Sequence, residues 1–143
     1  MSIKRNVAPT YLGGGDPALN DYYPTWLDNL ADDAIVEGSL LNGAVQGAEA
    51  VRSIVVTIRS LYDRQTFKFA GPYGENGFLE HYIAQVRGEP IGCVVLITRN
   101  AAGQTQHVVA SYRPRSSLLL LSRLLREKFA GTPYAEQLAA SES

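Results

Sequence analysis

The stretch WLDNLADDAIVEG, from Trp26 to Gly38, carries four carboxylates in thirteen residues and changes its hydrophobic period partway along. Its first half has apolar residues at helical spacing after a proline, which predicts a short helix ending near Ala31. From Ala34 the sequence AIVEGSLLNGAVQG is rich in β-branched residues and glycines, which predicts two short strands joined by a tight turn. The stretch therefore predicts where a helix ends and a sheet begins.

Two of the carboxylates, Asp32 and Asp33, lie at this predicted junction. Short acidic side chains at such a junction commonly accept hydrogen bonds from the nearby turn backbone. We therefore expect them to stabilise the turn, and we do not expect them to act as a catalytic acid/base pair.

The rest of the chain predicts one helix, a set of strands and a final helix. After Gly47, the segment AEAVRSIVVTIRSLY has apolar residues at helical spacing. Between residues 65 and 113, the runs QTFKFAG, GFLEHYIAQVR, IGCVVLITR and QTQHVVASYR are separated by short polar turns, which predicts a four-stranded antiparallel meander. The segment RSSLLLLSRLLREKFAG predicts a helix over residues 115–130, with Ser116 and Ser117 as candidate N-caps and Gly131 as its end.

Helices set against a mainly antiparallel sheet indicate an α+β fold. At 143 residues the chain suits a single domain, which we place at residues 17–134. Residues 1–16 include three consecutive glycines, Gly13 to Gly15, and predict a flexible N-terminal arm. Residues 135–143 predict a frayed tail.

The composition excludes several classes of partner. Thirteen basic residues balance 14 acidic ones, so no overall field favours a nucleic acid. The N-terminal residues lack the apolar run of a signal peptide or membrane span, so we expect no transmembrane segment and a cytoplasmic location. The single cysteine, Cys93, lies in the apolar run IGCVVLI and is expected to be a buried structural thiol. Because GGGDP lacks the strand, lysine and hydroxyl residue of a phosphate-binding loop, we expect no nucleotide cofactor, and no other cofactor is indicated.

The segment LADDAIVEG, Gly47 with AVRSIV after it, and a meander ending in the turn NAAGQ together resemble the nuclear transport factor 2-like superfamily. The similarity spans roughly residues 21–112 and is nearest to its SnoaL-like and ketosteroid-isomerase-like members. It implies a cystatin-like cone, in which helices close a strongly curved sheet around an apolar cavity, often in a homodimer. Members include isomerases, cyclases, hydrolases and dehydratases, and also domains that only bind or dimerise.

The sequence departs from ketosteroid isomerases at their catalytic positions. The residue after the Val-Glu of this motif is the proton-shuttling aspartate in those enzymes, and here it is Gly38. Their oxyanion-binding tyrosine and second acid correspond to the glycine-rich arm and to about Val95. A steroid-isomerase mechanism is therefore not expected. The usual long first helix is also missing, so we hypothesise that the leucine-rich last helix closes the cone, with a subunit contact as its alternative role.

Alternation along GFLEHYIAQVR decides which side chains face the predicted cavity. One face holds Phe78, Glu80, Tyr82, Ala84 and Val86, and the other holds Leu79, His81, Ile83, Gln85 and Arg87. The resemblance favours the first face inward, which makes Glu80 the candidate catalytic acid or base. A register slip of one residue would bring His81 inward instead. A structural, hydrogen-bonded Glu80 is the other alternative.

Four aromatic residues are candidates for ligand contact: Tyr22, Trp26, Tyr82 and Tyr112. The same strand pattern places Gln106 and Tyr112 inward and His107 outward. The two histidines lie on strands that are not neighbours in a simple meander, and no cysteine or acid stands at ligand spacing. We therefore expect no metal site.

Two functions remain open from the sequence. The first is a SnoaL-like domain with an apolar pocket for a small hydrophobic molecule, polycyclic or aromatic, on which it acts as a cofactor-independent isomerase, cyclase or dehydratase. The second is a non-catalytic dimeric binding or interaction module in which Glu80 is structural. The expected partners are the small apolar molecule and a second copy of the chain.

Overall fold

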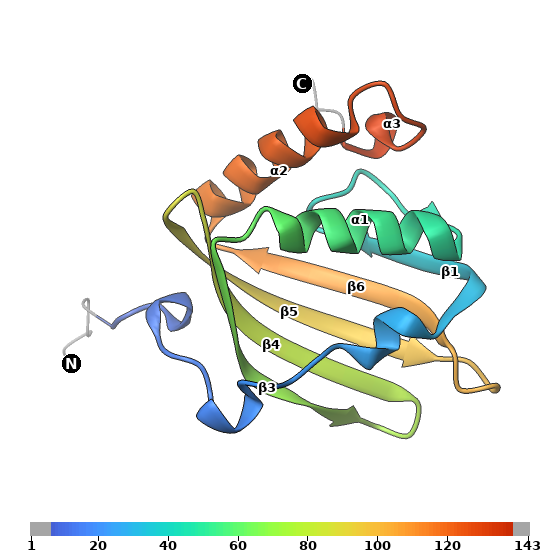
Figure 1. Ribbon diagram of the computed structural model, residues 1–143, viewed down its shortest axis with the longest axis horizontal. Helices are drawn as coiled ribbons and strands as arrows, with labels where there is room; N and C mark the ends of the chain where they lie inside the picture. Colours follow the sequence, from blue (N-terminus) through green and yellow to red (C-terminus); the bar gives the residue numbers. More distant parts are fainter. Residues whose placement is uncertain (1–6, 139–143) are drawn as a thin grey trace, which may run out of the picture.

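The computed structural model describes residues 7–138, in which six strands form one curved sheet with helices on its concave side (Figure 1). The strands are β1 (Leu30–Gly38), β2 (Val45–Gln46), β3 (Arg64–Tyr73), β4 (Gly77–Val86), β5 (Glu89–Arg99) and β6 (Thr105–Arg113). Their spatial order is β2-β1-β6-β5-β4-β3, and every neighbouring pair is antiparallel except β1 and β6. The α+β fold class predicted from the sequence is confirmed.

Strands β3 to β6 form the predicted meander, because short turns join them. Arg87 and Gly88, between β4 and β5, both have positive φ angles, of 52° and 80°. This is the geometry that two-residue hairpin turns favour. The pairing of β3 with β4 shifts register between Phe67 and Phe69, and that of β1 with β6 shifts between Leu30 and Ile35. Such irregularities bend strands and increase their twist, which suits a sheet this curved.

Helix α1 (Ala48–Ser60) covers the concave face of the sheet. Its apolar side buries Val51, Ile54 and Ile58, as the helical spacing predicts. Helix α2 (Arg115–Phe129) lies beyond α1, against the ends of β4, β5 and β6 (Figure 1). Helix α1 therefore covers the face of the sheet, whereas α2 packs at the strand ends next to α1.

The predicted N-caps of α2 are wrong. The helix begins at Arg115 after Pro114, which caps it with no side-chain hydrogen bond. Ser117 instead donates a hydrogen bond from Oγ to the carbonyl oxygen of Pro90, at 2.7 Å, and so ties α2 to the start of β5. A hydroxyl used between elements is not available to cap its own helix.

The helix predicted near Trp26 is only a short 3-10 turn, η3 (Thr25–Asp28), and β1 begins at Leu30 instead of Ala34. The chain is extended this early because Leu30 pairs with Thr105, whose Oγ1 donates to the carbonyl oxygen of Trp26 at 2.9 Å. The strand, and no turn, therefore contains both aspartates of the opening stretch.

The expectation that Asp32 and Asp33 bond turn backbone is accordingly wrong. Both are exposed on β1. Asp33 Oδ1 accepts a hydrogen bond of 3.0 Å from Gln106 Nε2 on the neighbouring strand. Both carboxylates are therefore exposed, and that of Asp33 supports the pairing of β1 with β6.

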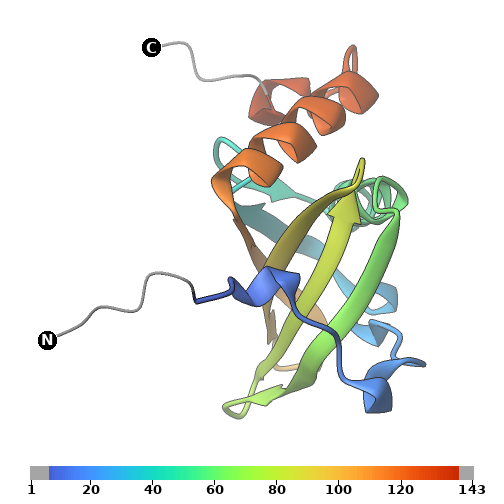
Figure 2. The same cartoon turned by 90° about the vertical axis from the view of Figure 1, so that its left-hand side faces the viewer.

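The N-terminal segment crosses the convex face of the sheet (Figure 2). It contains two 3-10 turns, η1 (Thr10–Leu12) and η2 (Pro17–Leu19). The carbonyl oxygen of Thr10 accepts a hydrogen bond of 2.9 Å from Lys68 Nζ, and its Oγ1 accepts one of 2.7 Å from Arg113 Nη2. The amide of Asp16 donates to the carbonyl oxygen of Phe67, at 2.8 Å. Of the predicted flexible arm, residues 7–16 thus contact the sheet, and residues 1–6 lie outside the described residues.

The chain after α2 differs from the predicted tail. Residues Ala135–Leu138 form a short helix, α3, and Leu138 is buried in the core. The amide of Asn42 donates a hydrogen bond of 2.7 Å to the carbonyl oxygen of Gln137. The frayed-tail prediction therefore fails at residues 135–138, because an apolar side chain there finds a buried position, and residues 139–143 lie outside the described part. Among the described helices, none is both long and apolar enough to cross a membrane.

Candidate ligand-binding cavity

A cavity lies between the concave face of the sheet, helix α1 and the segment before β1. Most of its lining is apolar: Pro24, Trp26, Val36, Val55, Ile58, Phe67, Val95, Val108 and Ala110. The polar side chains are those of Arg59, Gln65, Glu80, Tyr82 and Tyr112. Helix α2, which we expected to close the cone, contributes no residue to this lining and packs against the ends of β4, β5 and β6. Helix α1 and the segment around Trp26 cover the cavity instead.

The enclosed space is small. Its volume is about 50 Å³, and a single water needs roughly 10–15 Å³ by the same measure. The cavity in this conformation therefore holds a group of only a few non-hydrogen atoms, while the rest of a larger ligand would extend through its mouth.

Glu80 is the buried carboxyl of the cavity, with only 2% of its surface exposed. Strand alternation turns it to the concave face, where Trp26 Nε1 donates a hydrogen bond of 2.8 Å to its Oε2. The Tyr22 hydroxyl donates to the same oxygen. The other oxygen, Oε1, accepts no hydrogen bond from residues 7–138. In that range, every side-chain oxygen that is fully enclosed has a hydrogen-bond partner, so Oε1 is not fully enclosed. Oε1 therefore borders open space, which is the cavity.

The surroundings of Glu80 raise its pKa. Burial is the largest cause, because removing water disfavours the charged carboxylate. The hydrogen bonds from Tyr22 and Trp26 and the charge of Arg59 act in the opposite direction without reversing the shift. A carboxyl with a raised pKa can hold a proton nearer neutral pH, as a general acid or base requires.

A second polar group surrounds Cys93 deeper in the core. Tyr82 on β4 and Tyr112 on β6 lie directly opposite Cys93 on β5, and the Tyr82 hydroxyl is 2.6 Å from that of Tyr62. Burial raises the pKa of all three tyrosines and raises the pKa of the Cys93 thiol to about 12. These groups stay protonated at neutral pH, so the tyrosine hydroxyls are neutral and the buried thiol is unreactive.

The structure places the predicted ligand residues as follows. Trp26, Tyr82 and Tyr112 line the cavity. Tyr22 reaches Glu80 and packs its ring against Phe67, at a centroid distance of 4.7 Å. The structure thus brings all four aromatic candidates around Glu80 or deeper along the same cavity.

Both histidines lie on the convex face, so the slipped register that would bring His81 inward does not occur. His81 Nε2 accepts a hydrogen bond of 2.7 Å from Arg113, and burial lowers its pKa, as do the charges of Arg113 and Lys68. His107 Nε2 lies 2.6 Å from Glu37 Oε2 near solvent. Within residues 7–138, no group of three His, Cys, Asp or Glu side chains is arranged to bind a metal ion.

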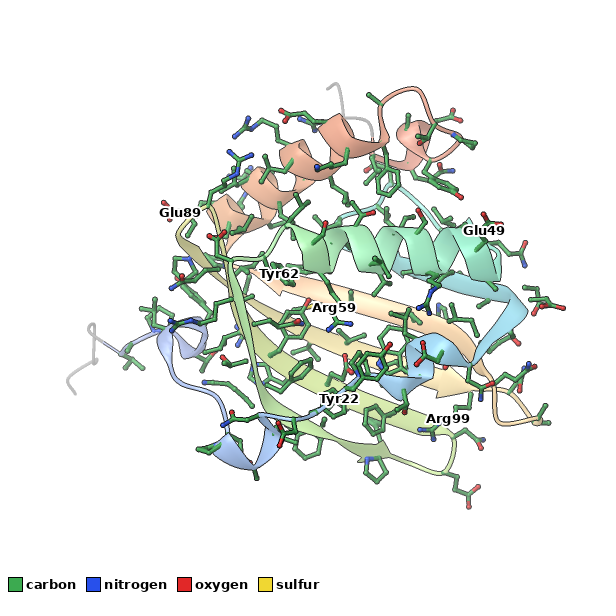
Figure 3. All side chains as sticks on the ribbon, viewed as in Figure 1. Tyr22, Glu49, Arg59, Tyr62, Glu89 and Arg99 are labelled. Atoms are coloured by element: carbon green, nitrogen blue, oxygen red, sulfur yellow. The ribbon has the colours of Figure 1, made fainter. Side chains whose placement is uncertain are left out.

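The sequence reasoning missed two polar residues of the cavity, Arg59 and Gln65. Arg59 stands four residues after Val55, which also faces inward, and Gln65 stands two residues before Phe67 on β3. These helical and strand spacings could have predicted that both side chains face inward. In Figure 3, Arg59 and Tyr62 extend from the end of α1 toward the sheet, and Tyr22 lies across the cavity from them.

The sequence matches no protein-family model and no curated protein. Solved structures resemble it in three dimensions. An uncharacterised bacterial protein with a cystatin-like fold from Silicibacter pomeroyi superposes with a TM-score of 0.69 at 15% identity, covering 80% of this chain and 91% of that one. A steroid delta-isomerase from Pseudomonas aeruginosa gives 0.68 at 17% identity, covering 75% and 79%. A protein of unknown function similar to nuclear transport factor 2, from Burkholderia xenovorans, gives 0.53 at 16% identity, covering 69% and 86%.

These likenesses confirm the resemblance seen in the sequence, at the level of the fold. The chain has the cystatin-like, nuclear transport factor 2-like fold. At such low identity the comparison carries no activity from one protein to another.

Proposed function

We propose that this cone-shaped protein binds a small apolar molecule in the cavity under α1 and that Glu80 exchanges a proton with it. The observation that carries the proposal is the arrangement of the Glu80 carboxyl. The buried Trp26 and the half-buried Tyr22 donate hydrogen bonds to its Oε2, while its Oε1 borders the apolar cavity without a partner. A general acid or base needs a carboxyl that is held in place and has one oxygen free to exchange a proton with the ligand.

The reaction that fits these groups is a proton transfer in an isomerisation, cyclisation or dehydration. Glu80 would take or give the proton, and the neutral hydroxyls of Tyr82 and Tyr112 would donate hydrogen bonds to a developing negative charge. None of these steps requires a cofactor. The location of the protein, expected to be cytoplasmic, stays a prediction.

Steroid isomerisation is not part of the proposal, although a steroid delta-isomerase shares the fold. The position corresponding to the aspartate of ketosteroid isomerases is Gly38, and a space of about 50 Å³ is too small to enclose a polycyclic ligand. We therefore revise the expected ligand from polycyclic to small, with one ring or a short chain.

Native mass spectrometry of the purified protein is the first experiment, because a ligand retained during purification would identify the chemistry. With that ligand or its analogue as substrate, Glu80→Gln is expected to abolish turnover and to change affinity less than about threefold, since glutamine keeps the shape and accepts the same hydrogen bonds. Equal turnover by the variant would remove Glu80 from the mechanism, whereas ligand binding without turnover by either protein would leave a binding protein.

The second candidate, a dimeric interaction module, is favoured by the convex face of the sheet. Phe69 and Val94 are 46% and 37% exposed there, and Leu79, Leu96 and Val109 lie on the same face between polar neighbours. Exposed apolar surface of this kind often marks a protein contact. Sedimentation equilibrium should then give twice the monomer mass, and a Phe69→Asp, Val94→Asp variant should give the monomer mass. A monomeric wild-type protein would exclude this candidate.

A further inference from the structure

Arg59 lines the cavity with a guanidinium that forms no ion pair with any acidic side chain in residues 7–138. We propose that the ligand is a small apolar carboxylate whose anionic group binds to the Arg59 guanidinium, an inference that rests on the proposed function of the cavity. Neither the fold nor the predicted role of Glu80 requires the ligand to be a carboxylate. It defines the substrate class of the site.

The guanidinium of Arg59 has no acceptor. It extends from the last turn of α1 and lines the cavity (Figure 3). It forms no ion pair or hydrogen bond with any residue from 7 to 138, and its nearest aromatic contact is the ring of Tyr23, 6.0 Å from Cζ. On the same helix, Arg52 does have partners, because its Nη1 donates hydrogen bonds of 2.9 Å to the carbonyl oxygen of Leu27 and 3.2 Å to Asp28.

Glu80 does not supply the missing acceptor. Its Oε2 is occupied by Tyr22 and Trp26, and it makes no ion pair with Arg59. The charge of Arg59 acts on Glu80 from a distance and lowers its pKa, but the two side chains form no ion pair, so the guanidinium remains without a carboxylate partner. An anion entering the cavity would balance that charge and would help to keep the proton on Glu80.

The chemistry of the lining indicates a carboxylate on an apolar body. A guanidinium presents a planar pair of N–H donors that matches the two oxygens of a carboxylate. Gln65 also lines the cavity and offers a second donor. The apolar side chains of Val55 and Ile58 lie on the same helix as Arg59 and suit a hydrocarbon part. The small volume restricts that part to a short chain or a single ring.

Matched pairs of ligands test the proposal: butyrate with butyramide, hexanoate with hexanamide, and benzoate with benzamide. Each pair differs in charge and hardly in shape. We expect isothermal titration of the wild-type protein to show at least one pair in which the carboxylate binds about tenfold or more tightly than the amide, since a charge-assisted hydrogen bond is about twice as strong as a neutral one. Arg59→Gln should remove this preference, and Arg59→Lys should retain part of it.

Lys128→Gln is the control, because it removes the same charge from an exposed position on α2 outside the cavity lining. It should leave the preference unchanged. Equal affinity for both members of every pair, or a preference that survives Arg59→Gln in a folded variant, would overturn the inference while leaving the proposed function in place. If neither member of any pair binds, both the inference and the proposed binding of small apolar molecules are contradicted. Thermal unfolding by circular dichroism shows whether each variant is folded.

Discussion

Gly38→Ala is expected to unfold the protein or to lower its free energy of unfolding by about 3 kcal/mol or more, the range of strained backbone and overpacking combined. Gly38 has a φ of +150°, and a Cβ built on it would lie 2.1 Å from the carbonyl oxygen of Ala110 and 2.9 Å from its amide nitrogen. These are main-chain atoms of β6, so they cannot move without disturbing the pairing of β1 with β6.

Chemical denaturation measures this effect, and Gly43→Ala is the matched control. Gly43 also has a positive φ, of +116°, but no atom lies within 4 Å of its added Cβ. The control therefore reports the cost of the dihedral angle alone, about 1–3 kcal/mol at most. If the two variants were equally stable, the close approach of Gly38 to β6 would not be a constraint.

The same contact bears on function. Gly38→Asp would place the aspartate of ketosteroid isomerases at the corresponding position, but its Cβ would meet the same backbone atoms of Ala110. We therefore expect this variant to misfold and gain no isomerase activity. Gly38 is required here by the close approach of β1 to the backbone of β6.

Glu80→Gln is expected to make the protein more stable than the wild type at neutral and higher pH. The folded protein raises the pKa of Glu80, chiefly by burial, whereas in the unfolded chain the value is near 4.3. Each unit of such a shift corresponds to about 1.4 kcal/mol. Functional residues often lower the stability of a protein, and Glu80, which faces the cavity, is expected to do so.

The direction of the pH dependence follows from linkage. For a group whose pKa is raised on folding, the contribution to stability is fully present below the unfolded pKa and is lost as the pH rises through the folded pKa. The free energy of unfolding of the wild type minus that of the variant should therefore be constant below about pH 4 and fall with rising pH. The other carboxyls titrate in both proteins and cancel in the difference. A flat difference from pH 4 to 8, or one that rises, would show that the pKa of Glu80 is not raised.

The sequence periods predicted the elements that have one clearly buried side. The helical spacing of Val51, Ile54 and Ile58 predicted α1. Alternation along β4 put Glu80 and His81 on opposite faces, and the family resemblance chose the face of Glu80 as the inward one. The start of β1 was missed because its first residues are held by pairing with β6, far along the chain. Such pairing leaves no local signal.

The rest of the candidate site depended on similar long-range contacts. The sequence indicated Trp26 and Tyr22 as candidate ligand contacts, but it did not show that both donate to Glu80, more than fifty positions away. It also did not show that Thr10 contacts Arg113 on the convex face. These contacts depend on the spatial order of strands that are distant in sequence. The family resemblance predicted the fold, but it did not predict these individual contacts.

Trp26 allows the most direct test of the central claim, because it is the only tryptophan in the chain, lines the cavity and donates its indole N–H to Glu80. The measurement is a titration of ¹⁵N-labelled protein with benzoate and with benzamide, following the indole N–H signal in ¹H–¹⁵N spectra. A cavity that binds small apolar molecules beside Glu80 predicts a saturable shift of this signal, together with the amides of Val55 and Ile58, while the amide of Val94 on the convex side stays in place. An indole signal that does not move at saturating concentrations of either compound, or movement confined to the convex face, would contradict the account.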